Sequence, residues 1–444
     1  MAVPVTVLCG SLGAGKTTLL TTLLEADDRD VAVVVNDVGE VNVDADLVEA
    51  RTSLEEGEEV LALENGCICC SLGGELSRSV VSLWKQYDFD ALVVEASGVG
   101  EPEPIAHQFV RGPAGGPYDL DTIVTVVDAR RFYDAFADGD GEPVRQGPDE
   151  DGTKPLADLW LEQVEFCDLL VVNKCDLVSD TERERVIALL ETLQPGAEIV
   201  TTEYGRVDPE TLLETGRFDL TAARESAGWK QAVEEAALVN GADRGEAHQH
   251  DHEEPDHRVH EHDHGHEHGD HGHEHHGHEH VHPPAEYGIE VDTYHRIRPF
   301  HPERFLELLA DLPAELVRAK GLCWIAGRDR QAITMSTAGT ETSLEVTGRW
   351  IASFSEQQQE TYRKGQPDLP WHEEHGDREC RLALIGRNLD LDELTARLDD
   401  CLVTDEEFEA DPSTFENPTP TAMGETIAIS AREAQEVRDA DSSD

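Results

Sequence analysis

The chain has 444 residues and carries 94 acidic against 35 basic side chains, a formal net charge of -59 at pH 7. This length predicts two or three domains, and so acidic a chain is not expected to bind nucleic acid, because phosphate backbones require clustered Lys and Arg. No apolar run approaches the roughly 20 residues of a membrane-spanning helix. The first residues lack the basic region of a signal peptide, so we expect a cytoplasmic protein.

The acidic excess is spread along the whole chain, and only seven of the 35 basic residues are Lys. This composition is typical of adaptation to a high-salt cytoplasm, where ions screen the repulsion between like charges. A halophilic protein is therefore expected. An acidic surface that binds a partner is the alternative, but such a surface would be local.

Residues 1–215 alternate short apolar runs with stretches of helical periodicity. The expected strands are Val3–Leu8, Val31–Val35, Leu92–Val94, Ile123–Val127 and Leu169–Val172, and the expected helices include Thr17–Glu25, Glu75–Trp84 and Thr181–Leu193. Strands that are apolar on both faces and alternate with helices predict an α/β domain, in which helices cover both sides of a mostly parallel sheet.

The second half of the chain divides into three parts. Residues 216–286 form a linker, and sixteen of the 21 His fall between His248 and His282, interleaved with acidic residues and Gly. This tract has almost nothing to bury and is expected to be disordered without metal. Residues 287–403 return to a compact pattern and predict a small α+β domain, whereas 404–444 read as an acidic, mobile tail.

The elements expected in this second domain begin with a strand at Ile289–Ile297 and a helix at Pro302–Leu309. Further strands are expected at Leu316–Ile325, Ala332–Met335, Ser343–Val346 and Arg381–Ile385, and a closing helix at Leu391–Leu398.

A phosphate-binding loop is predicted between the first strand and the first helix. The residues from Gly10 to Thr17 match the pattern GxxxxGK[ST] in the strand–loop–helix context that the pattern requires. Backbone N–H groups of such a loop surround phosphate oxygens, with Lys16 reaching the β- and γ-phosphates and the Thr17 hydroxyl binding Mg²⁺. The residues expected to contact phosphate are Gly10, Ser11, Leu12, Gly13, Ala14, Gly15, Lys16, Thr17 and Thr18.

A guanine-binding loop is predicted at Asn173, Lys174 and Asp176, which follow the strand Leu169–Val172. An Asp in this position accepts two hydrogen bonds from guanine, and adenine offers no such pair of donors. If the pattern Asn-Lys-x-Asp is considered by itself, a surface turn is the alternative interpretation. Because the motif ends a strand and follows a phosphate-binding loop, it favours GTP.

Acidic side chains between these motifs are candidates for the Mg²⁺ site and the switch loops. Glu95 ends an apolar strand and is expected, with Asp44, to bind Mg²⁺, so that Lys16, Thr17 and Glu95 form the catalytic group. Gly98 is placed to sense the γ-phosphate. No Gln stands at the obvious place for positioning water, so hydrolysis should be slow without a partner or bound metal.

Three cysteines in four residues, Cys67, Cys69 and Cys70, predict a zinc site. Thiolates brought together by a tight turn suit a soft or borderline ion, and Asp37, Glu40 or a group from a partner are candidates for the fourth ligand. A redox pair or a chance cluster is the alternative, although a disulfide between adjacent residues would be strained. The His248–His282 tract predicts many weak sites for divalent metals, or alternatively a solvated linker.

Several motifs in this order resemble the CobW-like metallochaperone GTPases, which belong to the P-loop NTPases. The resemblance rests on GSLGAGKTTLL, NDVGEVNVD, ENGCICC, VVEASG and FCDLLVVNKCDL, and in the second domain on RPFHPERF, RAKGLCWIA, GRWIAS and GDRECRLALIG. This chain differs from the usual family pattern at Ser11, where Phe is common, and at Asp37-Val38, where Glu-Phe is common.

The resemblance implies GTP binding, slow GTP hydrolysis and delivery of zinc, cobalt or another metal to a client metalloprotein. We therefore expect GTP, Mg²⁺ and Zn²⁺ as ligands, with Co²⁺ or Ni²⁺ as alternatives to zinc. A cobalt or nickel insertion GTPase, a His-rich metal buffer with a regulatory GTPase, and an ATP-driven metabolic enzyme are the alternative functions.

Overall fold

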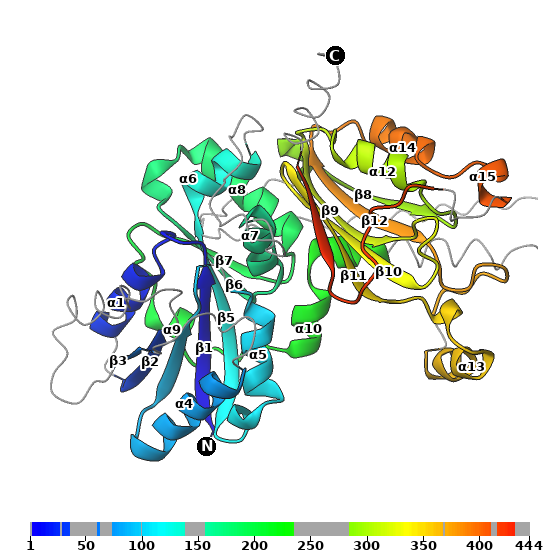
Figure 1. Cartoon of the computed structure of the whole chain (residues 1–444). Coiled ribbons are helices and arrows are strands. Elements are labelled where there is room, and N and C mark those ends of the chain that lie inside the picture. The colour runs from blue at the N-terminus through cyan, green and yellow to red at the C-terminus, as the bar shows by residue number, and fades with distance from the viewer. Residues whose placement is uncertain are drawn as a thin grey trace, which may run out of the picture.

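The computed structural model describes residues 2–26, 29–35, 60–62, 73–98, 100–137, 156–234, 284–366, 369–409 and 415–430. Two sheets organise these residues, one of seven strands and one of six (Figure 1). Each sheet has its own helices, and the two lie side by side with helix α7 (Leu156–Glu165) between them. No described helix combines the length and apolarity needed to cross a membrane.

The first sheet is parallel throughout, which confirms the predicted α/β fold class. Its strands run in the order β3-β2-β4-β1-β5-β6-β7. Their bounds are β1 (Val3–Gly10), β2 (Val31–Val35), β3 (Val60–Ala62), β4 (Ala91–Glu95), β5 (Tyr118–Asp128), β6 (Leu169–Asn173) and β7 (Glu198–Thr201). The strand β1, from which the predicted phosphate-binding loop emerges, lies in the centre of this order.

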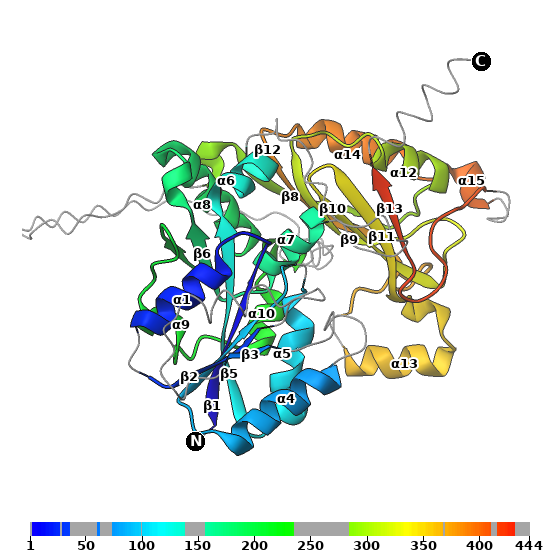
Figure 2. The ribbon, with the colours of Figure 1, turned by 60° about the vertical axis from the view of Figure 1, so that its left-hand side comes forward.

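Helices cover both faces of this sheet because alternate residues of each strand point to opposite sides. Val33 and Val35 of β2 pack in one cluster with α1 (Lys16–Ala26) and α9 (Pro209–Leu212). Val34 belongs to the opposite cluster. That cluster includes residues of α4 (Gly73–Gln86), α5 (Pro102–Val110), α7 and α8 (Asp180–Leu193). Figure 2 shows α1 on one side of this sheet and α5 on the other.

The second sheet is antiparallel and runs in the order β13-β11-β10-β9-β12-β8. Its strands are β8 (Ile289–Arg296), β9 (Leu316–Cys323), β10 (Gln331–Ala338), β11 (Glu341–Arg349), β12 (Cys380–Arg387) and β13 (Thr426–Ser430). Helices α12 (Pro302–Leu309) and α14 (Leu391–Asp400) pack into its core. Helices α13 (Glu356–Gly365) and α15 (Asp405–Glu409) lie at its periphery. This arrangement confirms a separate antiparallel domain at the C-terminal end.

Both folded parts extend beyond the limits expected from the sequence. Strand β13 pairs with β11 and packs Ile427 and Ile429 against the second core, so residues 426–430 of the predicted tail belong to the sheet. Helix α10 (Leu220–Glu225) and Trp229 pack against the first core, so the first domain extends into the predicted linker. Local composition does not reveal either element, because a few apolar residues are enough to pack against a sheet or helix that is already present.

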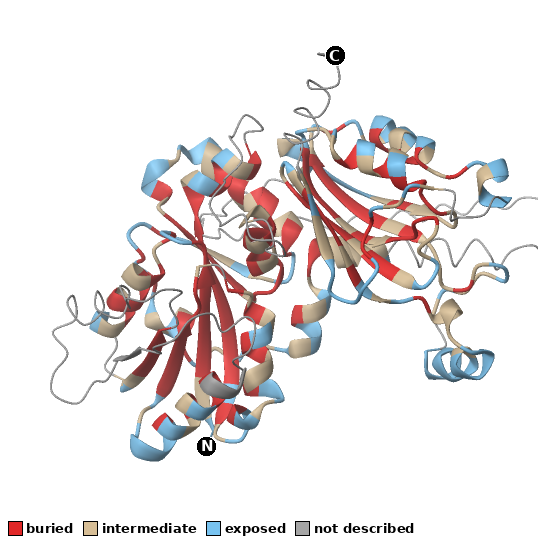
Figure 3. Ribbon diagram, viewed as in Figure 1, coloured by how far each residue is buried: buried red, intermediate tan, exposed pale blue. Residues whose placement is uncertain are grey.

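The two domains share a buried interface around α7. Val317 and Ala338 of the second sheet belong to the same apolar cluster as the core of the first domain. Figure 3 shows buried positions along the strands of both sheets. Arg318 of β9 is 0% exposed and binds two acidic residues of α7, with Nη1 at 2.5 Å from Asp158 Oδ1 and Nε at 2.6 Å from Glu165 Oε1. A fully buried ion cluster requires both surfaces to be present, so this contact fixes how the domains meet.

Candidate functional site

The predicted phosphate-binding loop lies between β1 and α1, and its shape requires glycine. Gly10 has a φ of +138°, and a Cβ there would stand 2.3 Å from the carbonyl oxygen of Val126. Gly15 has a φ of +108°, and its Cβ would stand 2.3 Å from the side-chain amide nitrogen of Asn173. A side chain at Gly10 would displace the backbone of β5, and one at Gly15 would displace the Asn173 amide.

Lys16 and Thr17 begin helix α1 directly after this loop. Lys16 is buried, and its Nζ donates to the carbonyl oxygens of Gly10 at 2.8 Å and Ser11 at 3.4 Å. The Thr17 hydroxyl donates to Oε1 of Glu95 at 3.5 Å, across the gap between α1 and the end of β4. A hydroxyl next to a carboxylate supplies the oxygen ligands that Mg²⁺ prefers, so these two residues fit such an ion.

The loop that follows β4 also reaches the phosphate-binding loop. A Cβ added to Gly98 would lie 2.8 Å from the backbone nitrogen of Leu12. Further along the same loop, the carbonyl oxygen of Gly100 accepts a hydrogen bond from Nε2 of Gln163 in α7. The structure therefore places Gly98 next to the phosphate-binding loop, and it links the following residues to the helix that carries the domain interface.

The predicted guanine-binding loop is tied to the phosphate-binding loop by hydrogen bonds. Asn173 donates from Nδ2 to the carbonyl of Ala14 at 2.9 Å, and its Oδ1 accepts from the backbone N–H of Gly205 at 3.1 Å. Lys174 donates to the carbonyl of Gly13 at 2.6 Å. Asp176 is exposed, so its carboxylate remains accessible. The two motifs, about 160 residues apart in the chain, form one continuous site.

Three further features of this site were not recognised in the sequence. Asp128, at the end of β5, caps the short helix α6 (Ala129–Phe132) and accepts from Lys174 Nζ at 2.7 Å. Arg131 of α6 donates from Nη1 to the carbonyl of Leu12 at 2.7 Å. The turn around Gly205 lies next to Asn173, and the backbone N–H of Gly205 donates a hydrogen bond to its Oδ1. The available signal was an Asp directly after an apolar strand, at the edge of the sheet where α/β proteins bind ligands.

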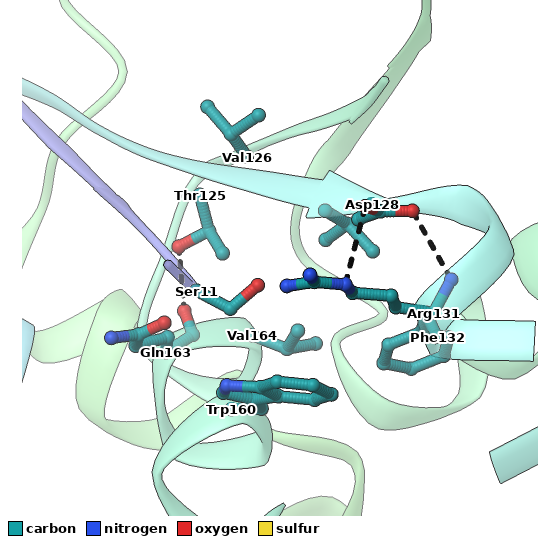
Figure 4. Close-up of a pocket in the computed structure, with 10 residues that line it drawn as sticks. Ser11, Thr125, Val126, Asp128, Arg131, Phe132, Trp160, Gln163 and Val164 are labelled. Carbon is teal, nitrogen blue, oxygen red and sulfur yellow. Dashed lines mark hydrogen bonds and ion pairs between the residues drawn. The ribbon is translucent and has the colours of Figure 1, made fainter. Parts of the chain in front are cut away.

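A small cavity lies beside the phosphate-binding loop, between β5, α6 and α7. It has a volume of about 20 Å³. Figure 4 shows Arg131 extending from the side of Asp128 toward Ser11, with the ring of Trp160 on the other side of the space. The space is large enough for about one water molecule.

The residues predicted to bind zinc, and the acidic residues predicted for the switch loops, lie outside the described residues. This applies to Asp37, Glu40, Asp44, Cys67, Cys69 and Cys70, and to the tract His248–His282. In the part of the chain that the structure describes, no group of three or more His, Cys, Asp or Glu could hold a metal ion. The six cysteines in that part are all buried, and burial raises the pKa of the Cys9 thiol to about 12.

Comparisons with known proteins match both domains. Residues 4–201 match the family model of the CobW/HypB/UreG nucleotide-binding domain, and residues 289–402 match that of the cobalamin synthesis protein CobW C-terminal domain. The zinc-regulated GTPase metalloprotein activator 1 of Dictyostelium discoideum is 31% identical over 432 residues, which cover 91% of this chain and 81% of that protein.

Two bacterial relatives match about half of the chain. The zinc chaperone CobW of Pseudomonas aeruginosa is 33% identical over 223 residues, covering 47% of this chain and 59% of that protein. The zinc chaperone YjiA of Escherichia coli is 32% identical over 225 residues, covering 49% of this chain and 63% of that protein.

Proposed function

We propose that this chain, which belongs to the CobW family of P-loop GTPases, is a GTP-hydrolysing metallochaperone that delivers zinc to a client protein. The observation that carries the nucleotide part is the hydrogen bonding of Asn173 to both the phosphate-binding loop and the turn at Gly205. This contact holds the guanine-binding and phosphate-binding loops in one site. A guanine base and its phosphates can therefore be bound together.

The roles proposed for the site follow from its geometry. The N–H groups of residues 10–18 bind the phosphates, Lys16 binds the β- and γ-phosphates, and Asp176 binds guanine. Thr17 and Glu95, with Asp44, would hold Mg²⁺, which neutralises charge on the phosphates when bound. Gly98 lies where its backbone can respond to the γ-phosphate, because it adjoins Leu12.

The metal part of the proposal rests on Cys67, Cys69 and Cys70. Three thiolates close in sequence suit zinc, and the names of the three relatives specify zinc, which favours it over cobalt or nickel as the cargo. Asp37 and Glu40 remain candidates for the fourth ligand. The His248–His282 tract would collect metal at low affinity and raise its local concentration. Adaptation to salt and a cytoplasmic location also remain predictions.

Nucleotide competition tests the enzyme part. Purified protein in molar salt with Mg²⁺ should bind GTP in preference to ATP, and Asp176→Ala should lose that preference because the donors of guanine are left without an acceptor. Equal affinity for ATP and GTP in the unmodified protein would rule out the guanine assignment.

Zinc titration against a chelating competitor tests the metal part. Cys67→Ser and Cys69→Ser should each lower the affinity of the tightest site, because each removes one thiolate. Deletion of residues 240–286 is the matched control, and it should remove only weak sites while GTP hydrolysis persists. If the deletion abolishes tight binding and the cysteine variants do not, the protein is a His-rich buffer.

A further inference from the structure

An arginine that no motif explains lies against the phosphate-binding loop. Asp128 caps helix α6 by accepting a hydrogen bond from the backbone N–H of Arg131 at 3.1 Å, which fixes the start of that side chain. The guanidinium then reaches Leu12 and lies 3.4 Å from the point where a Cβ of Gly13 would stand. The Arg131 side chain is 54% exposed, so it has room to move.

The neighbouring Arg130 shows what a structural arginine looks like at this position. Its guanidinium binds Asp134 and also lies 2.8 Å from Glu182, and these hydrogen bonds raise its pKa. Among the described residues, Arg131 instead has one carboxylate in its ion-pair range, that of Asp128, at 3.9 Å from its Nε. Lys174 already compensates that carboxylate at 2.7 Å. Arg131 is thus a cation whose charge is not fully neutralised by the described residues around it.

The contact with Leu12 resembles the contact that Lys16 makes. Lys16 is expected to bind phosphate, and its Nζ donates to the loop carbonyls of Gly10 and Ser11. Arg131 donates to the next carbonyl along the same loop. A phosphate oxygen is a stronger acceptor for a cation than a neutral carbonyl, because charge-assisted bonds are about twice as strong. Phosphate oxygens whose negative charge increases during hydrolysis therefore compete with the Leu12 carbonyl for Arg131.

We infer that Arg131 is a catalytic residue, which moves from the Leu12 carbonyl onto the phosphates and stabilises the transition state of GTP hydrolysis. This inference rests on the proposed function. In that reaction a water oxygen bonds to the γ-phosphorus while the bond from that phosphorus to the β,γ-bridging oxygen breaks. The bridging oxygen keeps the electron pair and leaves with GDP, and the water proton passes to the released phosphate. A guanidinium stabilises the negative charge on these oxygens.

Arg131 would stabilise charge in a chain that lacks a Gln at the expected water-positioning place. Arg131 supplies a positive charge from within the same chain. Its guanidinium contacts Leu12, the residue of the phosphate-binding loop that adjoins Gly98. Such an arginine stabilises the charge that develops in the transition state more than it stabilises the charge of the bound substrate. Its removal should therefore lower the rate of hydrolysis and leave the affinity for GTP nearly unchanged.

Single-turnover hydrolysis of bound GTP, with Mg²⁺ in molar salt, separates this role from a structural one. Arg131→Ala should reduce the rate by about 10²- to 10³-fold, Arg131→Lys should restore part of it, and Arg130→Ala serves as the matched control with a rate near that of the unmodified protein. Affinities for GTP and GDP are measured alongside. Binding of GDP with aluminium fluoride, which imitates the transferred phosphoryl group, should be lost in Arg131→Ala.

Each other outcome contradicts a specific part of the account. An unchanged rate in Arg131→Ala overturns the inference. A fall in GTP affinity that matches the fall in rate also overturns it, because Arg131 would then only hold Leu12 in place. If the unmodified protein neither binds nor hydrolyses GTP, the proposed function itself fails.

Discussion

Replacing Arg318 by Met tests how the two domains are held together. The Arg318 side chain is fully buried and binds Asp158 and Glu165, whose side chains are 3% and 6% exposed. Met fills a similar volume without the charge. The change leaves two carboxylates inside the interface with no guanidinium to compensate them, and charges in that position are poorly solvated.

The expected loss is about 3–5 kcal/mol of the free energy of unfolding, the usual cost of removing one partner from a buried ion pair. The loss should not be twice this value, because each carboxylate keeps a second donor. Ser336 donates to Asp158 at 2.7 Å, and the indole N–H of Trp229 donates to Glu165 at 3.2 Å.

The pH dependence of stability should change sign in this variant. Burial alone would raise the pKa of Asp158, but Arg318 and Lys320 outweigh it and hold that pKa below its ordinary value. In the unmodified protein this group therefore contributes stability at neutral pH, which is lost as the pH falls through the lowered pKa. Without Arg318, burial should raise the pKa, so that mild acid stabilises the variant.

Urea unfolding in molar salt, followed by Trp fluorescence from about pH 3 to pH 8, measures both effects, because the lowered pKa of Asp158 lies below its ordinary value of about 4. Lys364→Met is the control, because Lys364 and Glu360 form an exposed pair that should contribute roughly 0.3–0.5 kcal/mol. A loss in Arg318→Met as small as that of the control, with the same dependence on pH as the unmodified protein, would refute the argument.

Three further changes probe the first domain. Asn173→Ala should weaken GTP and GDP binding together and cost about 1–3 kcal/mol of stability, because it leaves buried groups unpaired, as nucleotide titration and urea unfolding would reveal. Gly205→Ala should cost about 1–3 kcal/mol in urea unfolding, since φ is +67° and the new Cβ would lie 2.8 Å from the Leu19 nitrogen. Burial raises the pKa of Asp168 to about 6. The folded state therefore binds a proton more tightly, and this group should lose stability as the pH rises from about 4 to about 6. Comparison of unfolding with Asp168→Asn, which lacks this slope, provides the measurement.

Local patterns in the sequence were sufficient to predict the strand, the loop and the helix that surround the predicted phosphate-binding residues. The apolar run before Gly10 and the helical pattern after Lys16 define a strand, a turn and a helix without long-range information. Asn173 follows another apolar run, and parallel strands bring their carboxyl ends to the same edge of a sheet. The hydrogen bond from Asn173 to Ala14 is therefore a consequence of two motifs that could be recognised separately.

Long-range packing could not be predicted in the same way. Arg318 stands in an apolar strand, and its burial depends on carboxylates that lie 160 and 153 residues earlier in the chain. Strand β13 lies within an acidic segment, and it is a strand because β11 offers an unpaired edge. Arg131 belongs to no motif, so only the fold reveals that it touches Leu12.

If this protein is a GTP-hydrolysing metallochaperone, the nucleotide bound at the phosphate-binding loop should control how tightly Cys67, Cys69 and Cys70 hold zinc. The most direct measurement is a zinc titration, against a chelating competitor in molar salt, of protein saturated with either a non-hydrolysable GTP analogue or GDP. The account predicts tighter zinc binding with the GTP analogue, and zinc should then favour that analogue over GDP by the same factor. Equal zinc affinity in the two nucleotide states would contradict it.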